Sequence, residues 1–408
     1  MDAITRRNAL TALAGAGITA ALGLPAHAAP KDKGPDHPSN RPGKGQGSGG
    51  KGKGQGSGGA EPTPEPPAPV QAFGPWTALG SHPSAEAHRP WRGHGINAMQ
   101  PYQGRLYLGY GNWNSNSGGA SRLGVDIAWY DPITGEFGID ATGMPGEAIE
   151  VFREINGRLF VPNTDPTGSR PGSFFSNVSG EWLHGPGTVS GEHMFDVCGT
   201  GVPGELFLVG SDGRGTLVNP TVWRSIDNGV TWEVFFQEPF AQNAARNGYE
   251  RFYWLAHADG KIYCRAAGMG NAVPLRVFDT AKRQWTTQKM GLGKANRIEL
   301  AAQQSFTNTF QSTPSMWYGR SSGWSNTEKY AWCDGKKAGW VSGITNFVNH
   351  GSKTDDGRVL IKQQDGIVHL IEGTAAIKIA EGAGTSVALL GGRLYTAFDG
   401  VLHVAEQV

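Results

Sequence analysis

The sequence has few cysteines, few charged residues and, beyond its first 30 residues, no long hydrophobic run. Cys198, Cys264 and Cys333 are too few and too widely spaced for a disulfide framework or a zinc motif. We expect buried free thiols on strands, with one disulfide and a spare thiol as the alternative. The formal net charge of +1 provides no field that would gather nucleic acid or an anionic membrane. A sequence-independent nucleic-acid binder is therefore disfavoured.

The chain does contain 62 Gly, 13 Trp, 10 Tyr and 17 Phe, against only 17% charged residues. Many turns that join short, aromatic-rich strands give this composition, whereas long helices enrich Ala, Glu, Lys and Leu. The composition predicts an all-β protein.

The N-terminus resembles a targeting sequence. Arg6 and Arg7 precede an apolar run over 9–24, and 26–28 (Ala-His-Ala) offers a signal-peptide cleavage site. Residues 5–10 resemble a twin-arginine signal, which implies a precursor exported in the folded state by the twin-arginine machinery. An alanine stands where an aromatic residue is usual, so the general secretory route stays open. We expect a signal peptide over 1–28, no transmembrane segment, and a mature protein in the periplasm, at the cell surface or outside the cell.

A Gly-, Lys- and Pro-rich segment follows the signal peptide. Residues 43–50 (GKGQGSGG) are nearly repeated at 52–59, and a Pro-rich stretch follows over 61–69. Such a segment cannot bury enough apolar surface to offset its conformational entropy. Residues 29–72 are predicted to be a disordered linker.

The remaining residues, 73–408, repeat one short pattern, a tight turn followed by an aromatic or aliphatic strand. Six copies lie at 103–107, 156–160, 203–207, 259–263, 356–360 and 391–395. The gap between the fourth and fifth copies is about twice the usual spacing, so a degenerate seventh copy is expected near 315–318. Seven units of about 48 residues each have the size of four-stranded propeller blades. The sequence predicts a seven-bladed β-propeller.

The two ends of this region predict how the ring closes. A second repeated element, a hairpin such as 128–137 or 277–285, supplies two more strands per blade. The last blade ends at 401–404 without its final strand, while a spare strand at 75–79 precedes the first blade. We expect this N-terminal strand to complete the last blade and protect its edge.

The segment 224–232 (RSIDNGVTW) resembles an Asp-box, the S-x-D-x-G-x-T-W hairpin of sialidase-like (BNR-type) propellers. The matching positions are Ser225, Asp227, Gly229, Thr231 and Trp232. The resemblance implies a structural role, in which the aspartate caps the turn and the tryptophan packs between blades. It also implies a position away from the active face. The arginine triad and the Tyr/Glu pair of sialidases cannot be assigned in this sequence, so sialidase activity is not expected.

The longer loops are predicted on the face where the inner strands begin, and loops on a rigid scaffold are common binding positions. The inner-strand starts and these loops supply polar candidates able to perform acid–base chemistry or hold a polar ligand. The candidate catalytic residues are Glu147, Glu150, Arg153, His193, Asp196, Arg251 and Tyr253, and the candidate ligand-binding residues are His94, Asn97, Asn112, Trp113 and Asp165; His257, Asn346 and His350 are further inner-strand candidates. The alternative is that these groups satisfy one another around a water-filled channel. No pair has metal-motif spacing, so no cofactor is expected, and a structural Ca²⁺ or Zn²⁺ is left open.

These residues favour an exported enzyme that cleaves a polysaccharide. A glycoside hydrolase would use two carboxyls among Glu147, Glu150 and Asp196. A polysaccharide lyase would use His193 or Tyr253 as base, with Arg153 or Arg251 neutralising a uronate. That arrangement is similar to propeller lyases at the level of the fold alone. The competing hypothesis is a non-catalytic propeller that binds a glycan or a protein at the cell surface.

Overall fold

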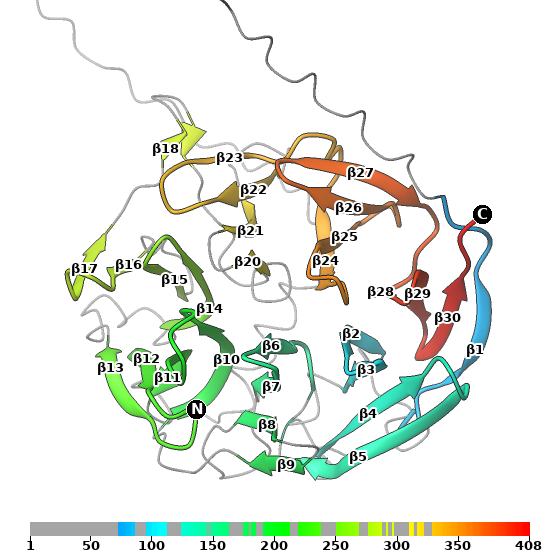
Figure 1. Cartoon of the computed structure of the whole chain (residues 1–408), viewed down its shortest axis with the longest axis horizontal. Coiled ribbons are helices and arrows are strands. Elements are labelled where there is room, and N and C mark those ends of the chain that lie inside the picture. Colours follow the sequence, from blue (N-terminus) through cyan, green and yellow to red (C-terminus); the bar gives the residue numbers. More distant parts are fainter. Residues whose placement is uncertain are drawn as a thin grey trace, which may run out of the picture. The chain divides into compact units, whose positions relative to one another are not determined.

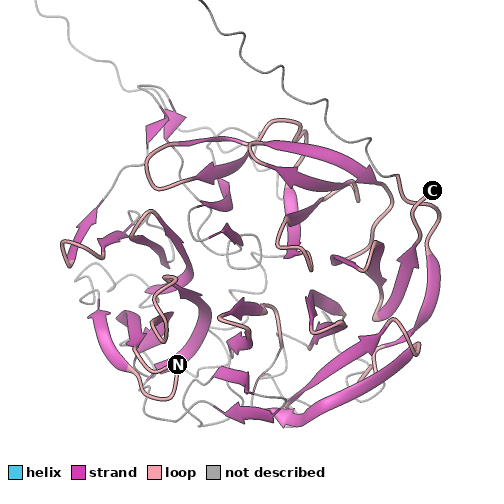
Figure 2. Cartoon of the chain, in the orientation of Figure 1, coloured by secondary structure: helices cyan, strands magenta, loops and turns pink. Residues whose placement is uncertain are grey.

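The protein is an all-β propeller of seven four-stranded antiparallel sheets, arranged as blades in a ring (Figures 1 and 2). The structure, a computed structural model, describes residues 72–85, 95–111, 124–144, 146, 148–162, 174–178, 181–184, 191–212, 219–237, 250–268, 276–287, 291–292, 296–297, 310–313, 316–321 and 329–408. The predicted seven-bladed fold is confirmed. The predicted signal peptide and linker lie outside the described residues, except for Ala72.

Each of the first four blades is built from four consecutive strands. Blade 1 contains β2 (Ile96–Tyr102), β3 (Arg105–Tyr110), β4 (Val125–Asp131) and β5 (Glu136–Met144); blade 2 contains β6 (Arg153–Ile155), β7 (Arg158–Pro162), β8 (Phe174–Val178) and β9 (Glu181–His184). Blade 3 contains β10 (Gly191–Gly199), β11 (Leu206–Asp212), β12 (Asn219–Ser225) and β13 (Glu233–Gln237); blade 4 contains β14 (Glu250–Ala258), β15 (Lys261–Gly268), β16 (Arg276–Asp279) and β17 (Gln284–Thr287).

The remaining strands form three further blades and one small sheet. Blade 5 contains β20 (Phe310–Thr313), β21 (Met316–Ser321), β22 (Lys329–Cys333) and β23 (Ala338–Trp340); blade 6 contains β24 (Val348–Lys353), β25 (Val359–Gln363), β26 (Val368–Glu372) and β27 (Ala375–Ala380). Blade 7 contains β28 (Val387–Leu390), β29 (Arg393–Phe398), β30 (Val401–Ala405) and β1 (Thr77–Ser81), and β18 (Gly291–Leu292) pairs with β19 (Asn296–Arg297).

The repeated turn found in the sequence joins the inner strand of a blade to its second strand. In blade 1, Gln103 and Gly104 have φ angles of 49° and 78°, and in blade 2 Asn156 and Gly157 have 53° and 73°. Glycine adopts this left-handed region without a Cβ penalty, and two such residues in sequence match the twist of a tight hairpin. The degenerate copy near 315–318 falls at the start of β21 in blade 5, where it was expected.

The N-terminal strand closes the ring. β1 pairs antiparallel with β30, from Thr77 opposite Val404 to Ser81 opposite Val401, and it begins two residues later than the predicted 75–79. The Trp76 indole N–H donates a hydrogen bond to the carbonyl oxygen of Glu381 at 3.0 Å, so the segment is also anchored to the end of blade 6.

Deleting residues 73–82 is expected to expose the edge of β30 and to cause aggregation with a lowered melting temperature. Deleting residues 30–70 is the control, because a segment predicted to be disordered contributes little burial. Both effects are measured by thermal unfolding and size-exclusion chromatography. A protein starting at residue 83 that melts like the full chain would show that β1 does not hold the ring closed.

The hydrophobic core is divided among the contacts between neighbouring blades. Trp232 from blade 3 is buried with Phe160 from blade 2, and Phe207 from blade 3 is buried with Phe278 from blade 4. Cys198, Cys264 and Cys333 are buried free thiols on strands, as expected. Because each blade packs on two neighbours, the ring holds the inner strands in fixed positions around the central axis.

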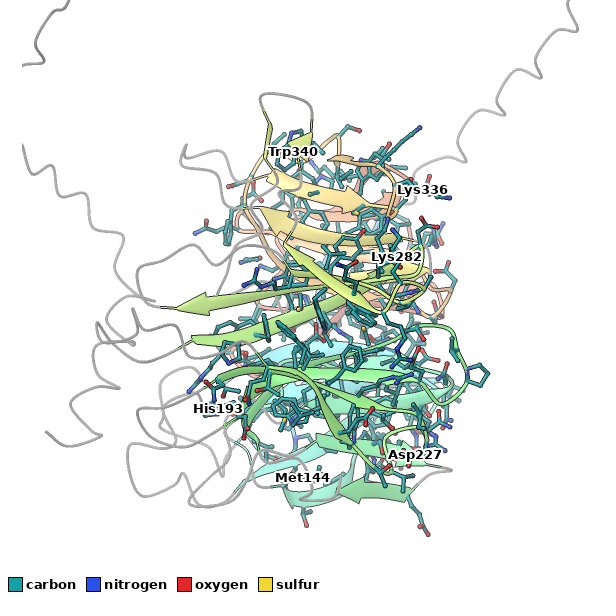
Figure 3. All side chains as sticks on the ribbon, turned by 90° about the vertical axis from the view of Figure 1, so that its left-hand side faces the viewer. Met144, His193, Asp227, Lys282, Lys336 and Trp340 are labelled. Atoms are coloured by element: carbon teal, nitrogen blue, oxygen red, sulfur yellow. The ribbon has the colours of Figure 1, made fainter. Side chains whose placement is uncertain are left out.

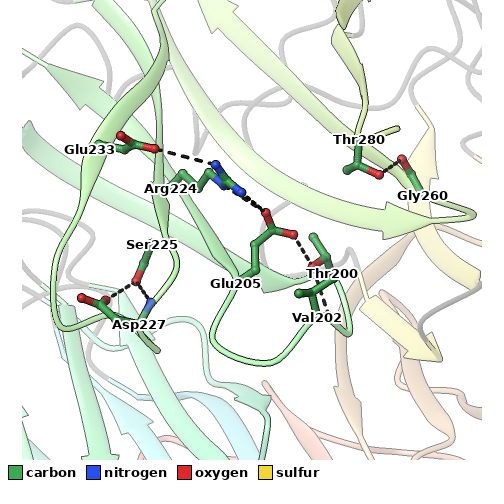
Figure 4. Close-up of polar contacts among 9 residues, drawn as sticks. All are labelled: Thr200, Val202, Glu205, Arg224, Ser225, Asp227, Glu233, Gly260 and Thr280. Carbon is green, nitrogen blue, oxygen red and sulfur yellow. Dashed lines mark hydrogen bonds and ion pairs between the residues drawn. The ribbon is translucent and has the colours of Figure 1, made fainter. Parts of the chain in front are cut away.

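The two ends of the blades differ in character. We call the end where the inner strands begin the start face, and the end carrying the turns between the first and second strands the turn face. Figure 3 shows the labelled His193 and Asp227 on opposite faces. On the turn face Arg224 donates to Glu205 at 2.9 and 2.6 Å, and the other Glu205 oxygen accepts from Thr200 at 2.6 Å (Figure 4).

The hairpin at 224–232 is held by its own polar side chains on the turn face. Asp227 accepts hydrogen bonds from the Thr231 backbone at 2.9 Å and from the Thr231 and Ser225 hydroxyls at 2.6 and 2.7 Å. Gly229 has a φ of 84°, and the Trp232 indole N–H donates to its carbonyl oxygen at 3.1 Å. Although partial burial opposes the effect, these hydrogen bonds lower the pKa of Asp227 to about 2.

Substituting Asp227→Ala is expected to destabilise the protein by about 1–3 kcal/mol, because turn donors lose their acceptor. The native pKa lies below the unfolded value of about 3.9. The stabilisation is therefore fully present above that value and is lost as the pH falls toward 2. Thermal unfolding between pH 7 and pH 2 should show this loss in the wild type and a weaker one in Asp227→Asn. Loss of ligand binding at unchanged melting temperature would contradict a purely structural role for this hairpin.

Candidate functional site

β-Bulges near the start face re-aim side chains of the inner strands. The pairing register shifts between Ile96 and Ala98 in β2, between Met194 and Asp196 in β10, and between Phe252 and Trp254 in β14. β24 carries an equivalent shift between Val348 and His350. The extra residues in β2, β10 and β14 are Asn97, Phe195 and Tyr253. A bulge often redirects a side chain beside an active site.

Phe195 brings three of the candidate catalytic residues together. The His193 and Tyr253 rings lie 5.8 and 4.6 Å from the Phe195 ring, centroid to centroid. The Arg251 guanidinium carbon lies 5.6 Å from the same ring. His193, Arg251 and Tyr253 are all buried. Two neighbouring inner strands thus gather an imidazole, a phenol and a guanidinium, which are groups able to move a proton and to bind a carboxylate.

Asp196 and Arg153 form a structural link among three blades. Arg153 Nε donates to Asp196 Oδ1 at 2.9 Å, and the Leu255 backbone N–H of blade 4 donates to Asp196 Oδ2 at 3.0 Å. The Val197 N–H also donates to Oδ1 at 2.9 Å. Burial raises the pKa of Asp196, while Arg153 and the backbone donors oppose that rise. Because both oxygens are engaged, these contacts assign Asp196 and Arg153 to holding blades 2, 3 and 4 together.

Glu150 is a buried carboxyl just before β6. It is 4% exposed, and its Oε1 has no hydrogen-bond partner among the described residues. Burial raises its pKa to about 8, with no compensating cation. The side chain is therefore protonated at neutral pH and can donate a proton.

The other sequence candidates divide into three groups. His94, Asn112, Trp113, Glu147 and Asp165 lie outside the described residues. Asn346, before β24, donates to Asp365 Oδ2 at 3.1 Å. His257 was placed at an inner-strand start, and that placement is wrong: it pairs with Ile262 beside the turn at Asp259, on the turn face. A nine-residue β14 reaches across the whole blade, which the sequence alone did not reveal.

Several buried polar atoms have no hydrogen-bond partner among the described residues. Asn97 Nδ2, Glu150 Oε1, Ser211 Oγ, Gln363 Nε2 and His369 Nδ1 lie toward the start face, and Ser352 Oγ lies toward the turn face. In the turns themselves, Asp131, Asp279 and Asp334 accept backbone N–H groups.

Two residues in this region escaped the sequence analysis. Phe195 was missed because the alternation of apolar and polar residues along a strand does not reveal where a bulge will form. Lys362 was missed although a single lysine after the apolar run Val359–Ile361 was a visible signal. The described residues contain no cluster of three His, Cys, Asp or Glu side chains placed to hold a metal ion. None of them forms a helix with the length and hydropathy needed to cross a membrane.

The fold and this site define a seven-bladed β-propeller in which the inner strands of blades 3 and 4 gather His193, Arg251 and Tyr253 around Phe195. The sequence matches no model of a known protein family, and no curated protein matches it.

Many solved structures resemble it in shape, including two enzymes and one designed protein. The GH74 enzyme of Niastella koreensis has a TM-score of 0.49 at 10% identity, over 83% of this chain and 54% of that chain. The α-L-arabinanase of Penicillium chrysogenum scores 0.37 at 13% identity, over 63% and 92%, and the computationally designed protein Ika8 scores 0.43 at 11%, over 81% and 99%. The chain thus spans about half the length of the GH74 enzyme. At these scores and identities the likeness carries no information about chemistry.

Proposed function

We propose that this protein is a carbohydrate-directed propeller that cleaves an acidic polysaccharide by β-elimination at the start face. The observation that carries the proposal is the meeting of His193, Arg251 and Tyr253 on the Phe195 ring. A uronic acid needs a base for its C5 proton and a cation for its carboxylate, and this cluster supplies both kinds of group. Arg251 lies on the same Phe195 ring as His193 and Tyr253, so Arg251 is assigned the carboxylate.

In the proposed reaction, Arg251 binds the uronate carboxylate and stabilises the negative charge that develops when C5 loses its proton. His193 or Tyr253 takes that proton. The C5–H bond and the C4–O bond break, the C4=C5 double bond forms, and the leaving oxygen takes up a proton. The products are a new reducing end and an unsaturated uronate, and water is not consumed.

Glycoside hydrolysis is the second candidate, favoured by Glu150. A carboxyl with a pKa of about 8 is protonated at neutral pH, as a general acid must be. A second carboxyl is also required. Asp196 is occupied by Arg153 and the Leu255 backbone, so the described residues of this cluster supply only one candidate.

We also propose that residues 1–28 direct export, that 29–72 form a linker, and that 73–408 form the propeller. The paired arginines at 6 and 7 ahead of an apolar run support the first proposal. The protein is then placed in the periplasm, at the cell surface or outside the cell. N-terminal sequencing of the exported protein tests the cleavage position after Ala28.

The activity is tested by incubating the protein with a panel of acidic and neutral polysaccharides. Reducing ends and the absorbance of unsaturated uronates are followed together. A rise in both supports β-elimination, and a rise in reducing ends alone supports hydrolysis with Glu150 as the acid. Binding to a polysaccharide without either product would replace both reactions with the non-catalytic alternative.

A further inference from the structure

Blade 6 holds a lysine side chain inside the protein without a carboxylate partner. Lys362, on β25, is 3% exposed. Its Nζ has one hydrogen bond, 3.5 Å to the carbonyl oxygen of Gln363, and no described carboxylate forms an ion pair with it. An ammonium removed from water and left uncompensated is costly. Burial accordingly lowers the pKa of Lys362 to about 8, against an opposing effect of Asp365.

The nearest titratable neighbour cannot compensate this charge. His350, on β24, stands directly opposite Lys362 in the strand pairing. The His350 Nδ1 accepts a hydrogen bond from the Val387 N–H at 3.2 Å, and the ring also bonds to the backbone of Asn97. Burial first, and then the charge of Lys362, lower the pKa of His350 to about 3. His350 is therefore neutral, and Asp365 is engaged by Asn346 and the Ile367 N–H.

A second donor lies beside His350. Asn97 is the bulge residue of β2, and its Nδ2 is buried without a partner. The backbone of Asn97 contacts the His350 ring, so Asn97 and Lys362 are both neighbours of His350. The junction of blades 6, 7 and 1 therefore presents an ammonium and an amide N–H₂ beside one neutral ring, with no carboxylate bonded to either among the described residues. Two buried donors in this position are suited to an anion.

We propose that Lys362 and Asn97 form a binding site for the carboxylate of an acidic sugar. One ammonium balances one negative charge, and two donors match the two oxygens of a carboxylate. Inorganic sulfate carries two charges and four oxygens, which this pair would leave partly uncompensated. The sugar identity rests on the proposed function: this site would hold a second uronate of the polysaccharide, on blades different from those that carry Arg251.

The site couples binding to protonation. An empty site releases the Lys362 proton near pH 8, whereas a bound carboxylate stabilises the charged form and raises the pKa. Binding at pH 8 is therefore accompanied by proton uptake. The affinity falls as the pH rises above 8 and is independent of Lys362 protonation well below it.

Isothermal titration calorimetry of the full chain tests this coupling. Galacturonate is titrated at pH 6.5 and pH 8.0 in two cationic buffers of different ionisation enthalpy. We expect uptake of about half a proton per bound galacturonate at pH 8.0 and almost none at pH 6.5. Lys362→Met should weaken binding at least tenfold and remove the uptake, and Asn97→Ala should weaken binding about tenfold.

Controls separate this site from the proposed reaction. Lys378→Met removes an exposed lysine of the same blade and should leave binding unchanged. Galactose, which lacks the carboxylate, should not bind. These titrations are made in the Arg251→Gln variant, because Arg251 is itself proposed to bind a uronate carboxylate. In that variant, galacturonate binding without proton uptake, binding that survives the addition of Lys362→Met, or binding of sulfate in place of galacturonate would each overturn the proposal. Because no turnover is measured, a protein that binds as expected but cleaves no polysaccharide keeps this site and loses only the proposed activity.

Discussion

Replacing Arg251 by Gln or His193 by Gln is expected to lower the rate of polysaccharide cleavage by about 10²–10⁴-fold, the usual effect of removing a charge-stabilising or proton-transferring group. The two side chains contact the same Phe195 ring from neighbouring blades, so either loss disables one half of the proposed proton abstraction. Initial rates of unsaturated-uronate formation measure the effect.

Two matched variants on other parts of the ring serve as controls. Arg358→Gln removes a half-exposed arginine on the turn face, and His403→Gln removes a histidine of β30. Both should retain wild-type rates. Substrate affinity should fall in Arg251→Gln and stay nearly constant in His193→Gln, because only the arginine is assigned to the carboxylate. Full activity in both site variants would rule out this cluster as the reaction centre.

Asp196→Ala is expected to cause a large loss of stability, about 3–5 kcal/mol, because it leaves the mostly buried Arg153 charge without its partner. The Leu255 N–H of blade 4 also loses its acceptor. Chemical denaturation monitored by tryptophan fluorescence measures the change. The matched control is Glu381→Ala, which removes an exposed carboxylate paired with Lys378 and should cost about 0–1 kcal/mol.

A double substitution distinguishes the loss of the ion pair from the exposure of one charge. Arg153→Met combined with Asp196→Leu removes both charges and keeps apolar volume. We expect it to be less destabilised than Asp196→Ala, because no buried charge remains. If the double variant is as destabilised as Asp196→Ala or more, the unpaired Arg153 charge is not the main cause of the loss, since both variants lack the acceptor of the Leu255 N–H.

The repeat pattern was sufficient to predict the fold. Tight turns such as Asn156-Gly157 recur at the blade interval, and their positive φ angles are a local property that the sequence displays directly. The turns are visible in the sequence because each depends only on residues close together in the chain. The ring closure could be predicted from a count of strands, since one strand is spare before blade 1 and one is missing after β30.

The candidate site could be predicted only in part, because bulges interrupt the two-residue alternation of a strand. In β10 the bulge at Phe195 changes the phase of the strand. Asp196 was predicted beside His193 as a candidate acid or base, and the structure adds its bonds to Arg153 and Leu255 of the two neighbouring blades. A period-two pattern assigns faces correctly only while the register is unbroken. The partners of Asp196 lie 43 and 59 residues away, and the sequence contains no signal of those contacts.

The pairing of β1 with β30 has a consequence for the order of biosynthesis. β1 is translated before every other strand of the propeller, yet its partner is the last strand of the chain. A chain that stops before Val401 leaves β1 without a partner and blade 7 unfinished. Pairing between strands so far apart in the sequence forms slowly, so we expect β1 and β30 to pair after the other blades have formed. Only a fully translated chain can pair β1 with β30 and so close the ring. If the precursor is exported folded, an incomplete chain would therefore reach the export step with an exposed strand edge, and a complete chain would not.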